Sequence, residues 1–315
     1  MYNQDASDDP KPPRPQPGIF ALGIPEHCYV EFDLLPEADP LELVRRLAAL
    51  SGPETTVGGL SVVVGFRPEL WAQLDPSVVV ASPVGPGSAP ARTRSFQTVS
   101  GPEVEFPATQ HDAWIWLAGG ARDVVFDSAR RVFDAVSGVA VPASEVTGWL
   151  YQHERDLTGF IDGTENPSVF EAADVAVAAD GSSVLLFQLW RHEQSWAELS
   201  VGQQERVIGR TKADSIELDE SDMPEDSHVS RNVVEEDGHE LRIYRRNVAY
   251  GGPSDHGTVF VGFCARQHPL QIMLERMAGV GDGIRDALTR YTTPLSGAYY
   301  VIPAATTLVQ YLPED

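Results

Sequence analysis

A short glycine-containing segment brings two carboxylates close together. Residues 155–167 have the sequence RDLTGFIDGTENP, in which Asp162 and Glu165 lie beside Gly159 and Gly163. Glycine allows tight turns that other residues resist, and Asn and Pro commonly end such turns. An aspartate held in this way can donate or accept a proton in a reaction. The residues alone leave two interpretations open, an active-site loop and an ordinary surface turn.

Histidines and cysteines give weaker signals. The chain has eight histidines, and a single histidine is more often a surface or core residue than a metal ligand, so the residues alone do not favour His228 over His153 or His256. Cys28 and Cys264 form no CxxC pair and no Cys/His cluster of the kind that binds zinc or attaches haem covalently. We expect both cysteines to be reduced and buried.

The charge balance excludes several partners. With 46 acidic and 23 basic residues among 315, the net charge is -23 and the pI is near 4.6. Nucleic acids and anionic membranes would repel such a protein. No apolar run is long enough for a membrane span. Residues 1–18 are rich in Asp and Pro without an export signal, which predicts a disordered tail on a cytoplasmic protein.

Hydrophobic periodicity predicts strands and helices in two halves of related order. We expect strands within 18–34, 60–66, 114–118, 183–190, 258–264 and 299–302, and helices at 40–50, 123–136, 201–208 and 267–277. Strand, turn and amphipathic helix follow one another similarly in each half, which favours two α+β domains. A parallel nucleotide-binding sheet is the alternative, although no GxGxxG or GxxxxGKS loop follows any strand.

The acidic segment 211–240 separates two of these strands. It has ten acidic residues between Asp214 and Asp237, and it contains His228. Loops of this length without their own structure are uncommon, and they are usually functional or disordered.

Several motifs together resemble one known family. GFIDGTENP at 159–167 resembles the signature of the dye-decolourising peroxidases. The segment around Ser227 and His228, with Arg231 and Asn232, resembles their proximal-histidine segment, and 245–251 matches their R-x-N-x-x-(F/Y)-G stretch. GRTK at 209–212 is also similar to the family. Covering nearly the whole chain in the right order, the motifs are most similar to the compact B-type branch.

The resemblance implies an α+β fold and a cofactor. It implies two ferredoxin-like domains, at 19–145 and 146–315, each an antiparallel sheet with flanking helices. Haem b would be held non-covalently, mainly by the C-terminal domain. His228 would be the proximal iron ligand, and Asp286 would be the carboxylate behind it. The further expected haem contacts are Gly163, Thr164, Glu165, Arg210, Arg245, Phe260 and Phe263. For at least one of the two phenylalanines packing in the sheet core is preferred, and Arg210 could instead pair with the acidic segment.

The implied activity is that of a haem peroxidase. Hydrogen peroxide would form a high-valent iron-oxo intermediate that oxidises phenols, dyes and similar one-electron donors. Asp162 would act as acid and base, Arg245 would stabilise developing charge, and Asn247 would orient peroxide. Whether Asp162 or Arg245 dominates differs within the family. Val248 and Ala249 depart from the proline that relatives often have before the aromatic residue.

Two other functions remain open at this point. One is a haem carrier or storage protein with weak peroxidase activity, and the other is a non-haem regulatory dimer that binds a small ligand between its domains. The presence of Asp162, Arg245 and Asn247 favours the peroxidase over the carrier, since carriage needs no acid and base.

The resemblance also suggests partners. Relatives often self-associate, so we expect a homo-oligomer. We do not expect encapsulin binding, because VQYLPED at the end does not resemble a cargo peptide. Carboxylates at Glu165, Glu217 and Glu240 could attract Mn(II), although a solvated acidic face is preferred. Packing is likewise preferred over a radical relay for four aromatic residues: Trp190, Trp196, Tyr250 and Tyr291. The negative charge should steer cationic donors towards the site.

Overall fold

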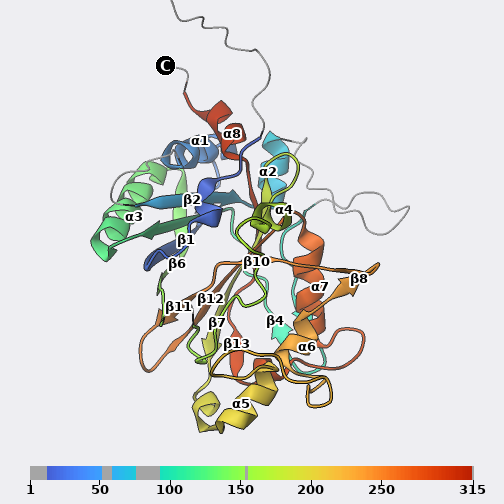
Figure 1. Cartoon of the computed structure of the whole chain (residues 1–315). Helices are drawn as coiled ribbons and strands as arrows, with labels where there is room; N and C mark the ends of the chain where they lie inside the picture. The colour runs from blue at the N-terminus through green and yellow to red at the C-terminus, as the bar shows by residue number, and fades with distance from the viewer. Residues whose placement is uncertain (1–12, 52–58, 76–92, 153–154, 314–315) are drawn as a thin grey trace, which may run out of the picture.

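Two antiparallel sheets form the centre of the molecule (Figure 1). The computed structural model describes residues 13–51, 59–75, 93–152 and 155–313. The N-terminal sheet has the strand order β6-β1-β5-β2, and the C-terminal sheet has the order β11-β12-β7-β14. Each is the strand order of a ferredoxin-like domain, so the expected fold class is confirmed. In the described part, no helix is both long and apolar enough to cross a membrane.

The N-terminal half alternates strands with helices that cover one face of its sheet. Asp39 accepts a hydrogen bond from the Leu41 N–H at 2.9 Å and starts α1, as its position before Pro40 predicts. Leucines and valines of α1 and α3 pack on the outer face of the sheet. The elements are β1 (Glu26–Leu34), α1 (Pro40–Leu50), β2 (Ser61–Phe66), α2 (Pro68–Leu74), β3 (Val99–Ser100), β4 (Glu105–Phe106), β5 (Ala113–Gly119), α3 (Arg122–Val136) and β6 (Ala140–Trp149).

The C-terminal half repeats this order with longer connections. Helix α7 packs on the outer face of its sheet, α6 lies beside the lower end of α7, and α5 lies below β7 at the bottom of the view (Figure 1). The elements are α4 (Ala172–Ala176), β7 (Ser183–His192), α5 (Val201–Ile208), α6 (His228–Asn232), β8 (Glu235–Glu236), β9 (His239–Glu240), β10 (Tyr244–Arg245), β11 (Val248–Gly251), β12 (His256–Cys264), α7 (Gln267–Ala278), β13 (Thr292–Pro294), β14 (Ala298–Ile302) and α8 (Ala305–Leu308). The described residues also form four short 3₁₀ helices: η1 (Pro17–Phe20), η2 (Gln194–Glu198), η3 (Ala287–Arg290) and η4 (Val309–Tyr311).

The two sheets join at both edges. Strand β6 pairs with β11, and β2 pairs with β14, so the eight strands of the two sheets form a closed ring. At the first seam, a Cβ on Gly148 would lie 2.5 Å from a Val248 methyl and 2.9 Å from the Ala249 carbonyl oxygen, which explains the glycine there. The inward faces of both sheets share one apolar core.

Two expectations about chain organisation were wrong. The expected domain boundary at 145/146 falls inside β6, which pairs with β1 along nearly its whole length, so the N-terminal sheet extends to Trp149. The expected tail also ends too late. Residues 1–12 lie outside the described residues, but Gln16 is buried and its side-chain amide bonds the backbone of Val64 and of Pro303.

Candidate active site

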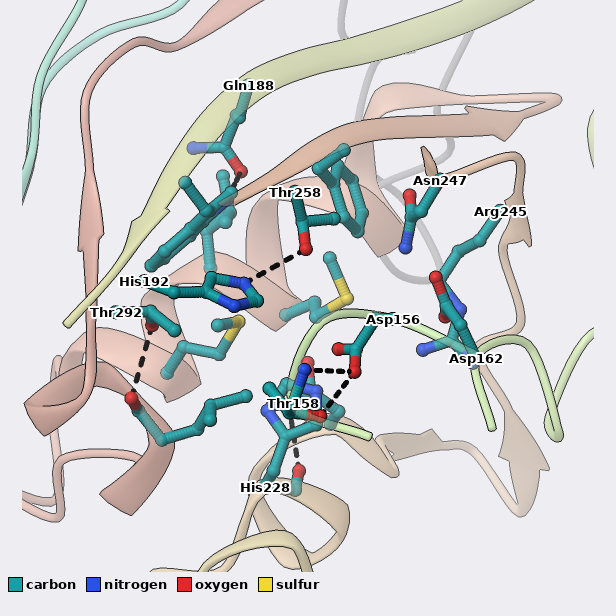
Figure 2. Close-up of a pocket in the computed structure, with 17 residues that line it drawn as sticks. Asp156, Thr158, Asp162, Gln188, His192, His228, Arg245, Asn247, Thr258 and Thr292 are labelled. Carbon is teal, nitrogen blue, oxygen red and sulfur yellow. Dashed lines mark hydrogen bonds between the residues drawn. The ribbon is translucent and has the colours of Figure 1, made fainter. Parts of the chain in front are cut away.

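The outer face of the C-terminal sheet forms the floor of a cavity (Figure 2). Side chains alternate along β7 and β12, so Gln188, Trp190 and His192 point to the same face as Thr258 and Phe260. Opposite them lie Met273, Leu274 and Met277 of α7 and Leu288 of η3. We call this space the sheet cavity; the two strands, α7 and η3 all contribute side chains to its lining.

His228 reaches the sheet cavity from the start of α6. Ser227 caps this helix by accepting a hydrogen bond from the Ser230 N–H. The Nδ1 atom of His228 lies 2.7 Å from Oδ2 of Asp286, whose side chain is fully buried. Because a carboxylate accepts this hydrogen bond, Nδ1 carries the proton and the lone pair lies on Nε2. The ring therefore has the tautomer that a metal-binding histidine needs.

Asp286 is held as firmly as the ring that it orients. Its second oxygen accepts a hydrogen bond from the Leu288 N–H at 2.9 Å and caps η3, and its own N–H donates to the Met277 carbonyl at the end of α7. The amide of Asn232 donates to Asp286 Oδ2 at 3.3 Å and to the His228 carbonyl at 2.7 Å. The expectation of a carboxylate behind His228 matches this geometry.

Asp162, Arg245 and Asn247 lie together on another side of the cavity (Figure 2). Asn247 accepts a hydrogen bond from the Val261 N–H at 3.0 Å through Oδ1, which leaves its NH₂ group available to the cavity. Within the described residues, the buried Nε of Arg245 has no hydrogen-bond partner. A buried guanidinium N–H without a protein partner suggests a polar ligand beside it.

The amide of Asn166 fastens the Asp162 loop to the strand that carries Arg245. Its Oδ1 accepts from the Arg245 N–H at 2.8 Å, and its Nδ2 donates to the Arg245 carbonyl at 2.9 Å. Gly163 has a φ of +79°, and a Cβ there would lie 2.9 Å from Asn166 Nδ2. The turn thus needs glycine at this position. The two bonds of Asn166 fix the position of the turn relative to strand β10.

A second cavity adjoins the first along the same loop. This loop cavity is lined by Gly163, Thr164, Glu165 and Arg210, all expected cofactor contacts, and it shares Asp162, His228 and Arg245 with the sheet cavity. Arg210 forms ion pairs with Glu165 and Glu217 and donates to the Ser215 carbonyl at 2.9 Å. Two of the three carboxylates considered for Mn(II) therefore bind an arginine.

The two phenylalanines that were expected to contact the cofactor lie on opposite faces of the sheet. Phe260 lines the sheet cavity, but Phe263 is fully buried in the core between the two sheets. They are three residues apart on one strand, and an odd spacing places side chains on opposite faces. Phe263 is therefore the phenylalanine that packs in the core, as preferred for one of the two, and its expected haem contact was wrong.

Asp156 is a site residue that the sequence did not indicate. It lines the sheet cavity and the loop cavity, and also a third cavity at the seam of the domains that includes His27, Tyr244 and Arg246. The N–H of Thr158 donates to its carboxylate at 2.8 Å, and the Thr158 hydroxyl donates as well. Burial, and then the charge of Asp162, raise the pKa of Asp156 to about 6. The site thus has a second carboxyl that titrates near neutral pH.

Asp156 should make stability depend on pH. Its pKa is higher in the folded protein than in the unfolded chain, so its contribution is present below pH about 4 and is lost as the pH rises through about 6. Asp156→Asn has no charge to bury, so we expect it to be more stable than wild type above pH 6, by up to about 3 kcal/mol, and equal near pH 4. Urea unfolding at both pH values measures this difference.

Asp174→Asn is the control, because Asp174 is exposed on α4. A difference between wild type and Asp156→Asn that is the same at both pH values would contradict the assignment.

Comparisons with known proteins cover both halves of the chain. The sequence profile described as "Dyp-type peroxidase, N-terminal" matches residues 46–150, and the profile described as "Dyp-type peroxidase, C-terminal" matches residues 153–307. A dye-decolorizing peroxidase of Mycolicibacterium paratuberculosis is 34% identical over 292 residues, which cover 86% of this chain and 82% of the relative. One from Mycobacterium tuberculosis is 34% identical, covering 84% and 79%.

Solved structures of such proteins have the same fold. A Dyp-type peroxidase protein, described as putative, from Shewanella oneidensis superposes with a TM-score of 0.85 at 27% identity, covering 95% of this chain and 98% of that one. DyPB from Rhodococcus jostii superposes with a TM-score of 0.82 at 32% identity, covering 93% and 97%. With both halves matched in sequence and nearly the whole chain matched in structure, the protein belongs to the Dyp-type peroxidase family.

Proposed function

We propose that this protein is a peroxidase that binds haem b non-covalently and uses hydrogen peroxide to oxidise phenols, dyes and similar one-electron donors. The observation that carries the proposal is one cavity lined by the Asp286-oriented His228 and by an acid, a guanidinium and an amide. Relatives named dye-decolorizing peroxidase support it, as do Rhodococcus jostii DypB variants solved in complex with heme. A haem carrier would not need the acid, the guanidinium and the amide of Asp162, Arg245 and Asn247.

The residues fit a haem. His228 keeps Nε2 free because Nδ1 donates to Asp286, and a carboxylate partner strengthens histidine as an iron ligand. Phe260, Met273 and Met277 offer an apolar lining to the macrocycle. The unpartnered Nε of Arg245 is available for a propionate or for peroxide. Bound there, haem supplies the redox chemistry, since its iron accepts oxidising equivalents from peroxide and passes them on to donors.

The chain itself supplies proton transfer and charge stabilisation. Cleavage of the O–O bond requires a proton to move from one peroxide oxygen to the other. We propose that the Asp162 carboxylate accepts this proton and returns it to the leaving oxygen. Arg245 stabilises the negative charge that develops there, and the Asn247 NH₂ group orients peroxide by a hydrogen bond. Asn166 fixes the position of Asp162 relative to Arg245 through its two hydrogen bonds to the Arg245 backbone.

Manganese does not enter this proposal. A DypB variant was solved in complex with manganese. Here Glu165 and Glu217 bind Arg210, and the described residues contain no group of three or more His, Cys, Asp or Glu side chains arranged to hold a metal ion. A cytoplasmic homo-oligomer remains a prediction from the family resemblance.

His228→Ala should abolish haem binding. The variant loses the nitrogen proposed to ligate the iron, so the Soret absorption band should be lost after reconstitution with haem. His192→Ala is the matched control, because His192 lines the same cavity but its Nε2 bonds Thr258 at 3.0 Å. We expect a normal band in the control. An unchanged band in His228→Ala would refute the ligand assignment.

Asp162→Ala and Arg245→Leu test the opposite side of the cavity. Removing one group that stabilises a transition state typically slows a reaction by about 10²–10³. We expect a loss of this size in the rate of reaction with hydrogen peroxide, measured by stopped-flow absorbance, in at least one variant. Met273→Leu lines the same cavity without a polar group and should react at the wild-type rate. Wild-type rates in both Asp162→Ala and Arg245→Leu would assign the proton transfer to other residues.

Charge should select the donors. Nine of the ten acidic residues between Asp214 and Asp237 are exposed, and this stretch carries His228. We therefore expect higher turnover of cationic than of sulfonated donors at low salt, with a difference that fades as salt rises. The triple variant Asp219→Asn, Glu220→Gln, Asp222→Asn should reduce the preference.

The control removes the same charge from the other domain. Asp123→Asn, Asp127→Asn and Asp134→Asn change exposed residues of α3, which packs on the N-terminal sheet. Equal turnover of both donor classes by wild type at low salt would contradict the electrostatic argument.

A further inference from the structure

An aromatic cluster fills the space between the two sheets. Trp114 and Trp116 of β5 have ring centroids 6.4 Å apart, and Trp114 lies 6.3 Å from Tyr300 of β14. Tyr29 lies 5.8 Å from Trp116 and 6.1 Å from Trp114. All four residues are at most 1% exposed. The interior of the protein thus contains a continuous path of oxidisable rings.

One sheet separates this cluster from the active site. On β12, Phe260 faces the sheet cavity and Phe263 faces the cluster, where it lies 6.4 Å from Trp116. Arg245 lines the cavity, while the next residue, Arg246, places its guanidinium 5.3 Å from the centre of the Trp116 ring. His27, which contacts Trp116, also lines the seam cavity together with Asp162, Arg245 and Asn247.

Two rings of the cluster have a proton acceptor. The Trp116 N–H donates to His27 Nδ1 at 3.0 Å. His27 Nε2 donates to the Ile24 carbonyl at 2.8 Å, so Nδ1 is unprotonated, and burial lowers the pKa of His27 to about 4. At the other end, the Tyr300 hydroxyl donates to Glu31 Oε1 at 2.7 Å. Among the described residues, Tyr29 Oη and Trp114 Nε1 have no partner.

The acceptors decide on which ring the oxidising equivalent can remain. Loss of an electron makes an indole N–H or a phenol O–H strongly acidic, and a positive charge is costly in a buried site unless the proton leaves. The positive charge of Arg246 opposes a lasting cation on Trp116. At Tyr300 the situation is the reverse, because proton transfer neutralises the buried Glu31 carboxylate. Burial raises the pKa of Glu31, which favours the protonated product.

We propose that Trp116, Trp114 and Tyr300 form a relay that carries one oxidising equivalent from the active site to the Tyr300–Glu31 pair. The inference rests on the proposed peroxidase function, which supplies the oxidant. In the last step, the Tyr300 phenol gives one electron to the oxidised Trp114 and its proton to Glu31. A neutral phenoxyl radical and a carboxylic acid result, Trp114 is restored, and the active site has been reduced by one electron.

The relay gives the enzyme a way to react with peroxide when no donor is present. The oxidising equivalent moves away from the sheet cavity to a ring that solvent does not reach, since Tyr300 and Glu31 are 0% and 2% exposed. Tyr300 is therefore an electron-transfer residue with a fixed proton partner.

Freeze-quench electron paramagnetic resonance tests the relay. The full-length protein, reconstituted with haem, is mixed with hydrogen peroxide without a donor. We expect an organic radical signal that narrows when the protein contains ring-deuterated tyrosine. Tyr300→Phe should lose this signal, and Glu31→Gln, which keeps the side-chain shape but removes the base, should diminish it several-fold.

Tyr29→Phe is the matched control. Tyr29 lies in the same cluster and is as deeply buried, but its hydroxyl has no acceptor in the part of the chain that the structure describes, so its removal should leave the signal unchanged. Trp116→Phe should delay the signal. If Tyr300→Phe does not fold, Glu31→Gln and Tyr29→Phe still distinguish the two tyrosines.

The same samples separate failure of the relay from failure of the proposed function. Absence of a Soret band, or of any spectral change with peroxide, would overturn the peroxidase and the relay together. A normal reaction with peroxide but no tyrosyl signal would overturn the relay alone. So would a signal that persists in Tyr300→Phe and Glu31→Gln, or one that Tyr29→Phe removes.

Discussion

The hydrogen bond between His228 and Asp286 is the interaction on which the site depends. It joins residues 58 positions apart, and it brings α6 against η3 and the end of α7. The same carboxylate fixes the tautomer of the ring and caps η3. Because Asp286 is completely buried, its charge has to be matched by these donors. Ring direction, helix packing and ligand basicity therefore have one common cause.

The two faces of β12 serve two different chemistries. Thr258 and Phe260 line the sheet cavity, while Val259, Val261 and Phe263 belong to the core between the sheets. A shift of one residue in the pairing of β12 with β7 would exchange these faces. Gly257 helps to prevent such a shift, because its Cα approaches the Trp190 backbone so closely that no Cβ would fit. The register of β12 against β7 therefore determines both the lining of the sheet cavity and the composition of the aromatic cluster.

Local signals in the sequence were sufficient for the four longest helices of the described residues and for six of their seven longest strands. The predicted helix 201–208 is confirmed with both ends correct, since Ser200 and Gln203 form a capping box and Gly209 takes a left-handed φ of +94°. Strand β6 was missed because half of its residues are exposed and it lacks a long apolar run. The site needed the family resemblance, since no local pattern connects His228 with Asp286. Asp156 was missed because a carboxylate in a turn looks solvated until the surrounding chain is known.

The closed ring of strands has a consequence for synthesis. Strands β1, β2, β5 and β6 can pair before the C-terminal half exists, but their inward face carries Tyr29, Trp114 and Trp116. Until β7 and β12 cover it, this half presents a wide aromatic surface to water, which favours aggregation. Closure then requires contacts between distant parts of the chain, such as β2 with β14, and such contacts form slowly. The emerging chain is therefore most prone to aggregation before β7 and β12 have been made.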